Sequence, residues 1–199
     1  MKLGELVTEI RGRARSFPYV IALEGTIGSG KSYEGELLHE ALSPDALLIS
    51  MDLFVCVPRS LWERKIGEED ISLRDWYDID KVRDTLRSVR EKKIFGVSGL
   101  YNIESGDINN RIMLDAERCR YLILEGLFSF DEELDGLIDM RVFIDTPPEV
   151  ALARAEARDE SRRHLDHRRW LEKRKIYFDG YLPYIEEHRN IADIILDPD

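Results

Sequence analysis

The segment with the most specific chemistry is Gly25-Thr26-Ile27-Gly28-Ser29-Gly30-Lys31-Ser32, which matches the pattern GxxxxGK[ST] in full. Glycines let the backbone approach a polyphosphate, and successive N–H groups can then point at its oxygens. In such a loop Lys31 reaches the β- and γ-phosphates, and the Ser32 hydroxyl binds Mg²⁺. The segment predicts a loop that binds a nucleoside triphosphate; the plain alternative is a glycine-rich turn between a strand and a helix.

Two acidic residues follow apolar runs and could complete this chemistry. Asp52 follows the run 46–50, and Glu125 follows the run 121–124. A carboxylate in the place of Asp52 could accept the proton of a substrate hydroxyl that attacks the γ-phosphate. Glu125 could hold Mg²⁺ together with Ser32, and Asp52 is a third candidate near the metal. The alternatives are a helix-capping Asp52 and a solvated Glu125 at the end of a strand.

The elements that must position these residues follow from the apolar pattern. Apolar runs at 19–23, 46–50, 121–124, 141–145 and 192–196 predict strands, and the stretches 3–15, 32–42, 80–92 and 147–158 predict helices between them. Asp80 is the expected N-cap of the third helix. Strands that are apolar throughout predict an α/β fold of the P-loop NTPase type, with a mainly parallel sheet covered by helices on both faces. Such sheets bind ligands at the carboxyl ends of their strands, and we predict one kinase domain over residues 1–199.

Composition limits the classes of partner. The chain has 29 basic and 40 acidic residues and a net charge of −11, which argues against a binder of polymeric nucleic acid or of membrane surfaces. No apolar run approaches the ~20 residues of a membrane span, and the first residues lack the apolar core of a signal peptide. Two cysteines without CxxC spacing fit a reducing compartment. We therefore expect a cytoplasmic protein without a membrane or nucleic-acid partner.

Positive charge is concentrated in residues 154–175, which hold nine of the 29 basic residues. In P-loop kinases an arginine-bearing lid closes over the phosphates and offsets the charge that develops there. Arg158 and one of Arg162 or Arg163 are the candidates for that role. The alternative for the stretch as a whole is a solvated helix with ion pairs within it, because acids are mixed among the bases.

The order of these motifs resembles that of the uridine kinase and phosphoribulokinase family. The P-loop, Asp52-Leu53-Phe54 and Glu125-Gly126 carry the resemblance. Three weaker segments continue it: Tyr77-Asp78, Tyr101-Asn102, and Tyr181-Leu182-Pro183 followed by residues 190–195. Together they span residues 19–197 in the order of the family. The resemblance implies an ATP- and Mg²⁺-dependent kinase that transfers phosphate to a hydroxyl group, as a nucleoside kinase does, and it also implies association into homo-oligomers.

The resemblance implies roles for individual residues as well. Asp52 would be the catalytic base, and Ser32 and Glu125 would serve the metal. Asp78 beside Tyr77 would bind substrate hydroxyls, and Tyr101 would line the acceptor pocket. The lid would bring Arg158 and Arg162 to the nucleotide and Arg163 to the substrate. The rings of Trp62, Trp76 and Tyr77 could stack on a substrate or simply pack under a long connection.

The chain departs from the family at the position that selects the acceptor. The family's uridine kinases read the pyrimidine with a histidine five residues after the Tyr of their Tyr-Asp element, and Gly106 stands there in this chain. Asn102 replaces the Asp of that element, and Ala155 stands where a second lid arginine is common. Three functions stay open: a nucleoside kinase, a kinase of another hydroxyl compound such as pantothenate, glycerate, a sugar or a sugar phosphate, and a nucleotide-binding regulator without an acceptor.

Overall fold

The computed structural model describes residues 1–62, 64, 72–163, 170–171, 174, 181, 184–185 and 187–198, with the backbone alone for residues 162 and 163. The helices of this part are α1 (Leu3–Arg13), α2 (Lys31–Leu42), α4 (Ile79–Arg90) and α5 (Pro148–Arg163), with short 3-10 helices η1 (Met51–Phe54), η2 (Arg59–Leu61), η3 (Leu73–Trp76) and η4 (Glu132–Leu134). The strands are β1 (Tyr19–Gly25), β2 (Ala46–Ser50), β3 (Ile94–Leu100), β4 (Asn110–Asp115), β5 (Tyr121–Glu125), β6 (Met140–Ile144) and β7 (Ile194–Leu196).

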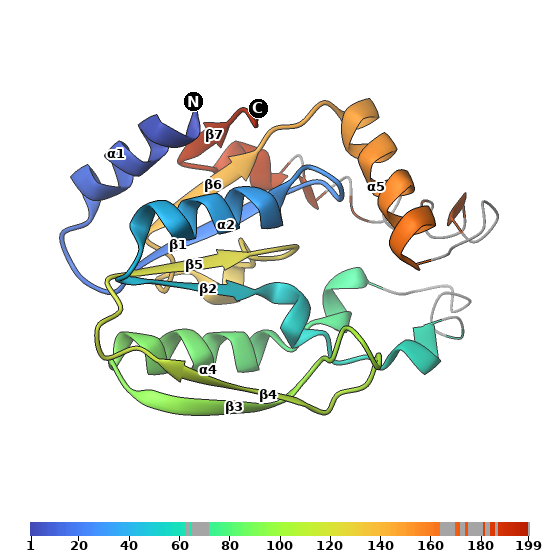
Figure 1. Cartoon of the computed structure of the whole chain (residues 1–199), viewed down its shortest axis with the longest axis horizontal. Helices are drawn as coiled ribbons and strands as arrows, with labels where there is room; N and C mark the ends of the chain where they lie inside the picture. Colours follow the sequence, from blue (N-terminus) through green and yellow to red (C-terminus); the bar gives the residue numbers. More distant parts are fainter. Residues whose placement is uncertain are drawn as a thin grey trace.

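Five strands form one parallel sheet in the order β2-β5-β1-β6-β7. Every residue of β1 and β5 is buried, as expected for strands that are covered on both faces. Helices α1 and α2 cover one face, and α4 lies against the other (Figure 1). The predicted α/β fold with a mainly parallel sheet is confirmed.

Side chains of β1 and β5 alternate between two cores, one on each face of the sheet. Ile21 and Ile123 pack with residues of α1 and α2, whereas Val20 and Leu122 pack with residues of α4. Burying one such side chain contributes about 1.5–3 kcal/mol. The two cores therefore hold the sheet rigidly, and the strand ends fix the loops that follow them.

The register brings the predicted chemical residues to the same edge of the sheet. Ser50 at the end of β2 is paired with Glu125 at the end of β5, and Glu125 is paired in turn with Leu23 in β1. The P-loop therefore leaves β1 directly beside the strand end that carries Glu125. Asp52 lies two residues after the adjacent end of β2, on η1.

Strands β3 and β4 form a separate antiparallel hairpin that the sequence analysis did not predict. The residues of β4 alternate regularly in exposure, whereas the alternation of β3 breaks at Gly99, where the strand register shifts. The hairpin lies beside α4, on the side of that helix away from the parallel sheet (Figure 1). It brings Tyr101, just beyond β3, toward η1.

Helix α4 begins one residue earlier than expected. Asp78 has non-helical backbone angles, and its Oδ1 accepts the N–H of Lys81 at 3.0 Å, so Asp78 is the N-cap. The prediction that Asp80 caps this helix is wrong, because the bond from Asp78 N–H to the Phe54 carbonyl (2.9 Å) fixes the chain before the first turn. Among the described helices, none is long and apolar enough to cross a membrane.

Candidate active site

The P-loop joins β1 to α2 and holds its lysine against its own backbone. Gly30 adopts a left-handed conformation (φ +97°) at the N-cap of α2, a conformation that glycine allows without strain. The Lys31 ammonium donates to the Gly25 carbonyl at 2.9 Å and to the Thr26 carbonyl at 2.8 Å. The first N–H groups of a helix have no partner within it and attract anions. The loop and α2 therefore offer the backbone donors that a phosphate needs.

Two hydroxyls of the P-loop are buried without a hydrogen-bond partner among the described residues, those of Thr26 and Ser29. A buried polar atom without a partner costs free energy. The loop itself is fixed from outside, since Thr146 Oγ1 donates to the Ser29 carbonyl at 2.8 Å. The arrangement is that of a preformed loop with unsatisfied polar atoms, which suits a polar ligand.

Burial and charge oppose each other at Lys31. Burial lowers the pKa of Lys31, and the carboxylates of Glu125, Glu24 and Asp52 act in the opposite direction. An ammonium with three acids around it can remain charged in a site that excludes water. Lys31 is thus the cation around which the acids of this edge are gathered.

The metal candidates lie together. Ser32 Oγ donates to Glu125 Oε2 at 3.1 Å. Burial raises the pKa of Glu125, and the nearby charge of Asp52 acts in the same direction, while Ser50 and Lys31 oppose it. The described residues contain no group of three or more His, Cys, Asp and Glu side chains around one point. The donors present are a hydroxyl and carboxylates, the oxygen ligands that Mg²⁺ takes when phosphates and water complete its shell. These residues therefore suit Mg²⁺.

The residues expected at the acceptor lie where the start of α4 and the end of β3 meet η1. Asp52 lies exposed on η1 with its N–H bonded to Ser50 Oγ at 3.3 Å. Asp78 donates its N–H to the carbonyl of Phe54, and Tyr101 donates its N–H to the carbonyl of Leu53 at 2.7 Å. The structure therefore brings together the three acceptor residues expected from the sequence, although their roles stay predictions.

The rings of Trp62, Trp76 and Tyr77 lie in this region and pack on other rings; that they stack on a substrate stays a prediction. Trp62 stacks on Tyr101 with ring centroids 6.0 Å apart, and it also contacts Trp76 at 5.7 Å. Tyr77 contacts Phe128 at 5.2 Å instead. The Tyr101 hydroxyl and the Trp76 ring nitrogen are buried and have no hydrogen-bond partner among the described residues. The rings pack on each other, and two of them keep polar atoms that a ligand could satisfy.

Gly106, the departure from the family, is enclosed by Arg59. A Cβ at Gly106 would lie 2.7 Å from Arg59 Cβ, and the backbone there has φ +81°. Arg59 donates its N–H to the Gly106 carbonyl at 2.8 Å, and its guanidinium donates to the Ile103 carbonyl at 2.5 Å. A side chain at position 106 is thus excluded by both space and backbone conformation, and Arg59 takes the adjacent volume.

Helix α5 packs directly on the P-loop. A Cβ at Gly28 would lie 2.0 Å from the carbonyl oxygen of Ala151 and 3.1 Å from the amide nitrogen of Ala155. Ala151 and Ala155 are fully buried, so an arginine at position 155 would not fit this packing. The same helix brings Arg154 Nη1 within 4.0 Å of the Cβ position at Gly30. Arg154 is a candidate that the sequence analysis left out of the site.

Arg158 lies one turn further along α5. Its Nε is 3.3 Å from Oδ1 of the buried Asp159, and its charge acts on Lys31. The side chains of Arg162 and Arg163 lie outside the described residues, as do residues 164–169, 172, 173 and 175 of the expected lid at 154–175. The structure therefore brings two arginines, Arg154 and Arg158, toward the P-loop.

A buried carboxylate immediately before the P-loop was also missed. Glu24 is fully buried and accepts hydrogen bonds from Tyr181 Oη at 2.7 Å and Phe130 N–H at 2.8 Å, with His188 Nδ1 2.7 Å away. Burial lowers the pKa of His188, but the hydrogen bond and charge of Glu24 outweigh it, and the pKa is raised. Burial beside Glu24 also raises the pKa of Tyr181 well above its ordinary value. One charged residue in an otherwise apolar strand was the available signal.

Comparisons with known proteins agree with this geometry. The profile of the Phosphoribulokinase / Uridine kinase family matches residues 20–198. The chain is 27% identical over 187 residues to a uridine kinase of Borrelia hermsii, covering 89% of this chain and 85% of that protein. It is 26% identical over 183 residues to mouse uridine-cytidine kinase-like 1, covering 89% of this chain but only 33% of the mouse protein.

A solved structure from Bacillus stearothermophilus, described as a possible uridine kinase, has the same fold. It superposes with a TM-score of 0.72 at 16% identity, covering 98% of this chain and 97% of that one. The P-loop, the acids after β2 and β5, and a profile that matches nearly the whole chain all agree with the resemblance noted in the sequence. The chain belongs to the phosphoribulokinase/uridine kinase family.

Proposed function

We propose that the protein is an ATP- and Mg²⁺-dependent kinase that transfers the γ-phosphate to a hydroxyl of a small molecule, with the 5′-hydroxyl of a nucleoside as the first candidate. The observation that carries the proposal is the Ser32–Glu125 contact of 3.1 Å, made where the P-loop leaves β1 beside the end of β5, with Asp52 following the next strand of the sheet, β2. The printed names of the relatives, uridine kinase and uridine-cytidine kinase-like 1, favour a nucleoside.

On the phosphate side, the residues of the P-loop bind and orient ATP. Lys31 would exchange its two carbonyl partners for phosphate oxygens, and the amides from Gly25 to Ser32 would hold the chain of phosphates. Ser32 and Glu125 would hold Mg²⁺, which offsets phosphate charge when bound. Arg154 and Arg158 on α5 would close over the nucleotide, and Arg162 would join them.

On the acceptor side, Asp52 would orient the attacking hydroxyl and take its proton. The oxygen of that hydroxyl forms a bond to the γ-phosphorus, the bond to the β,γ-bridging oxygen breaks, and ADP leaves. Asp78 beside Tyr77 would hold further hydroxyls of the acceptor, Tyr101 would bound the pocket, and the lid residue Arg163 would reach the substrate. The wall of aromatic rings would exclude water from the reacting atoms.

The test is to replace the proposed base and the proposed phosphate ligand separately. Asp52→Asn should keep ATP binding and lower acceptor-dependent ADP formation about 10²–10⁴-fold, because a general base contributes about that much. Lys31→Ala should weaken both. Asp80→Asn is the matched control, since the Asp80 carboxyl is 75% exposed and has no part in the mechanism. Full transfer by Asp52→Asn would show that Asp52 is not the base.

A second candidate is a kinase of a hydroxyl compound without a pyrimidine. The enclosure of Gly106 by Arg59 favours it, because no side chain can read a base from position 106. A panel of acceptors with ADP release as the readout separates the candidates: turnover of uridine or cytidine alone excludes the second. ATP binding without stimulation by any acceptor would favour a regulator over both.

A further inference from the structure

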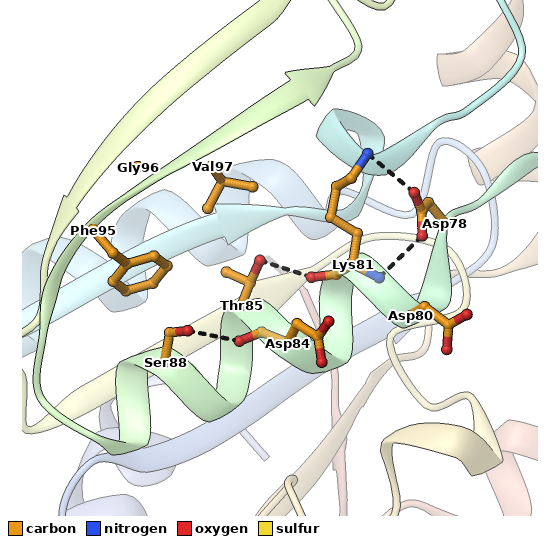
Figure 2. Close-up of a pocket in the computed structure, with 9 residues that line it drawn as sticks. All are labelled: Asp78, Asp80, Lys81, Asp84, Thr85, Ser88, Phe95, Gly96 and Val97. Carbon is orange, nitrogen blue, oxygen red and sulfur yellow. Dashed lines mark hydrogen bonds and ion pairs between the residues drawn. The ribbon is translucent and has the colours of Figure 1, made fainter.

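The acceptor residues depend on contacts between α4, the β3–β4 hairpin and η1, and these elements lie outside the parallel sheet. Between α4 and β3 runs a groove of about 360 Å³, lined by Thr85 and Ser88 on the helix and by Phe95 and Val97 on the strand (Figure 2). Along this groove the two elements do not fill the space between them. A contact at the end of the groove is therefore needed to fix the position of Asp78, the N-cap of α4, relative to the hairpin.

Lys81 spans that end. Its ammonium lies 3.0 Å from Asp78 Oδ2 and 3.0 Å from the carbonyl oxygen of Gly99, and its N–H donates to Asp78 Oδ1 at 3.0 Å. Figure 2 shows the side chain of Lys81 leaving the first turn of α4 to meet Asp78. Both side chains are 31% exposed. One residue thus contacts both oxygens of the Asp78 carboxylate and also binds the neighbouring element.

The partner of Lys81 on the hairpin is a special position. The strand register shifts between Ser98 and Leu100, and Gly99 has φ +65°, so Gly99 is the bulged residue. A bulge bends its strand and redirects the side chains that follow, and bulges are common beside active sites. Two residues later, Tyr101 binds the Leu53 carbonyl of η1 and stacks on Trp62.

We infer that Lys81 is a positioning residue for the acceptor: its ammonium orients Asp78 and fixes the bulge at Gly99, so that Asp78 and Tyr101 form one wall of the acceptor site. An exposed ion pair three residues apart on a helix would have a small effect. This pair differs because it also bridges two elements across a groove. The catalytic part of the inference rests on the proposed function, since it assumes that Asp78 binds acceptor hydroxyls.

The kinetic test compares Lys81→Met with Lys81→Arg in the full chain, using the best acceptor of the panel. We expect Lys81→Met to raise the KM for the acceptor about tenfold, as loss of a charge-assisted contact does, and to leave the KM for ATP within about twofold. Lys81→Arg should recover most of the loss, because a guanidinium can reach both oxygen partners. Arg87→Met is the matched control: Arg87 makes an ion pair with Asp84, three residues before it on the exposed side of α4. An unchanged KM for the acceptor in Lys81→Met would overturn the inference.

A second measurement does not need an acceptor. The Tyr101 amide is bonded to η1, and its hydrogen exchange should become at least about fivefold faster in Lys81→Met, because opening of the hairpin end costs less. Lys81→Arg and Arg87→Met should exchange as the wild type does. If the wild type phosphorylates no acceptor, the proposed function fails, and the exchange rate alone then tests whether Lys81 holds the end of the hairpin. Unchanged exchange at Tyr101 would overturn it.

Discussion

The buried carboxylate of Glu24 offers a sharp test of how the end of β1 is held. Glu24 directly precedes Gly25 of the P-loop, and its partners Tyr181 and His188 come from the C-terminal part of the chain. Tyr181→Phe removes one hydroxyl and keeps the ring, which is 1% exposed and packs edge-on against Phe128. The change therefore deletes one hydrogen bond and little else.

The size of the effect follows from the geometry. A hydrogen bond to a charged group contributes about 1.5–3 kcal/mol net, and the bond from Tyr181 Oη to Glu24 is short at 2.7 Å, with both groups buried. Glu24 keeps other partners, among them Phe130 N–H and His188, so its carboxylate remains hydrogen-bonded after the substitution. We expect a loss of about 1.5–2 kcal/mol of unfolding free energy, or a fall of roughly 3–8 °C in Tm for a chain of this size.

Urea-induced unfolding of the full chain, followed by circular dichroism and tryptophan fluorescence, measures this loss. The midpoint should fall for Tyr181→Phe while the slope with denaturant stays constant. Tyr184→Phe is the control, because Tyr184 stacks beside Tyr181 but is 38% exposed. A Tyr181→Phe variant within about 0.5 kcal/mol of wild type, the range of ordinary surface changes, would refute the assigned network.

Two further predictions concern titrating groups. The pKa of His188 is raised beside Glu24. The pair therefore stabilises the fold fully below the ordinary histidine pKa of about 6.5 and loses that contribution as the pH rises through the raised value. The difference in unfolding free energy between wild type and His188→Asn should shrink from pH 5.5 to pH 9, and a difference that does not change with pH would contradict the pair. Burial raises the pKa of Cys119 to about 11, so a thiol reagent at pH 8 should modify the exposed Cys56 but not Cys119 until urea is added. Equal reaction of both thiols in the folded chain would refute this.

Features held within one stretch of chain could be predicted from the sequence. The P-loop is eight consecutive residues, and the runs before Asp52 and Glu125 are apolar except for Ser50, so their place at the carboxyl edge of a parallel sheet followed from strand type alone. Helix α5 was also expected, but its close packing on Gly28 was not. That packing depends on Ala151 and on tertiary contact, which spacing does not reveal.

Features that depend on distant pairings could not be predicted. Glu24 pairs with residues 157 and 164 positions away, and nothing in the local sequence names Tyr181 or His188 as its partners. The cap of α4 was assigned to Asp80, although Asp78 is also of a residue type that caps helices. The choice of Asp78 is made by the Phe54 carbonyl, which belongs to another element.

The difference between local features and distant contacts also separates the part of the proposed function that is common to the family from the part that is specific to this chain. Phosphate binding follows from one contiguous loop, so it is shared wherever that loop occurs. The proposed acceptor wall is built instead from contacts between elements: Arg59 encloses Gly106, and Lys81 joins Asp78 to the bulge at Gly99. Gly106 and the guanidinium of Arg59 stand where the family's uridine kinases have a histidine, and Asp78 is bound by Lys81. The choice of acceptor therefore does not follow from the P-loop and has to be measured on this chain.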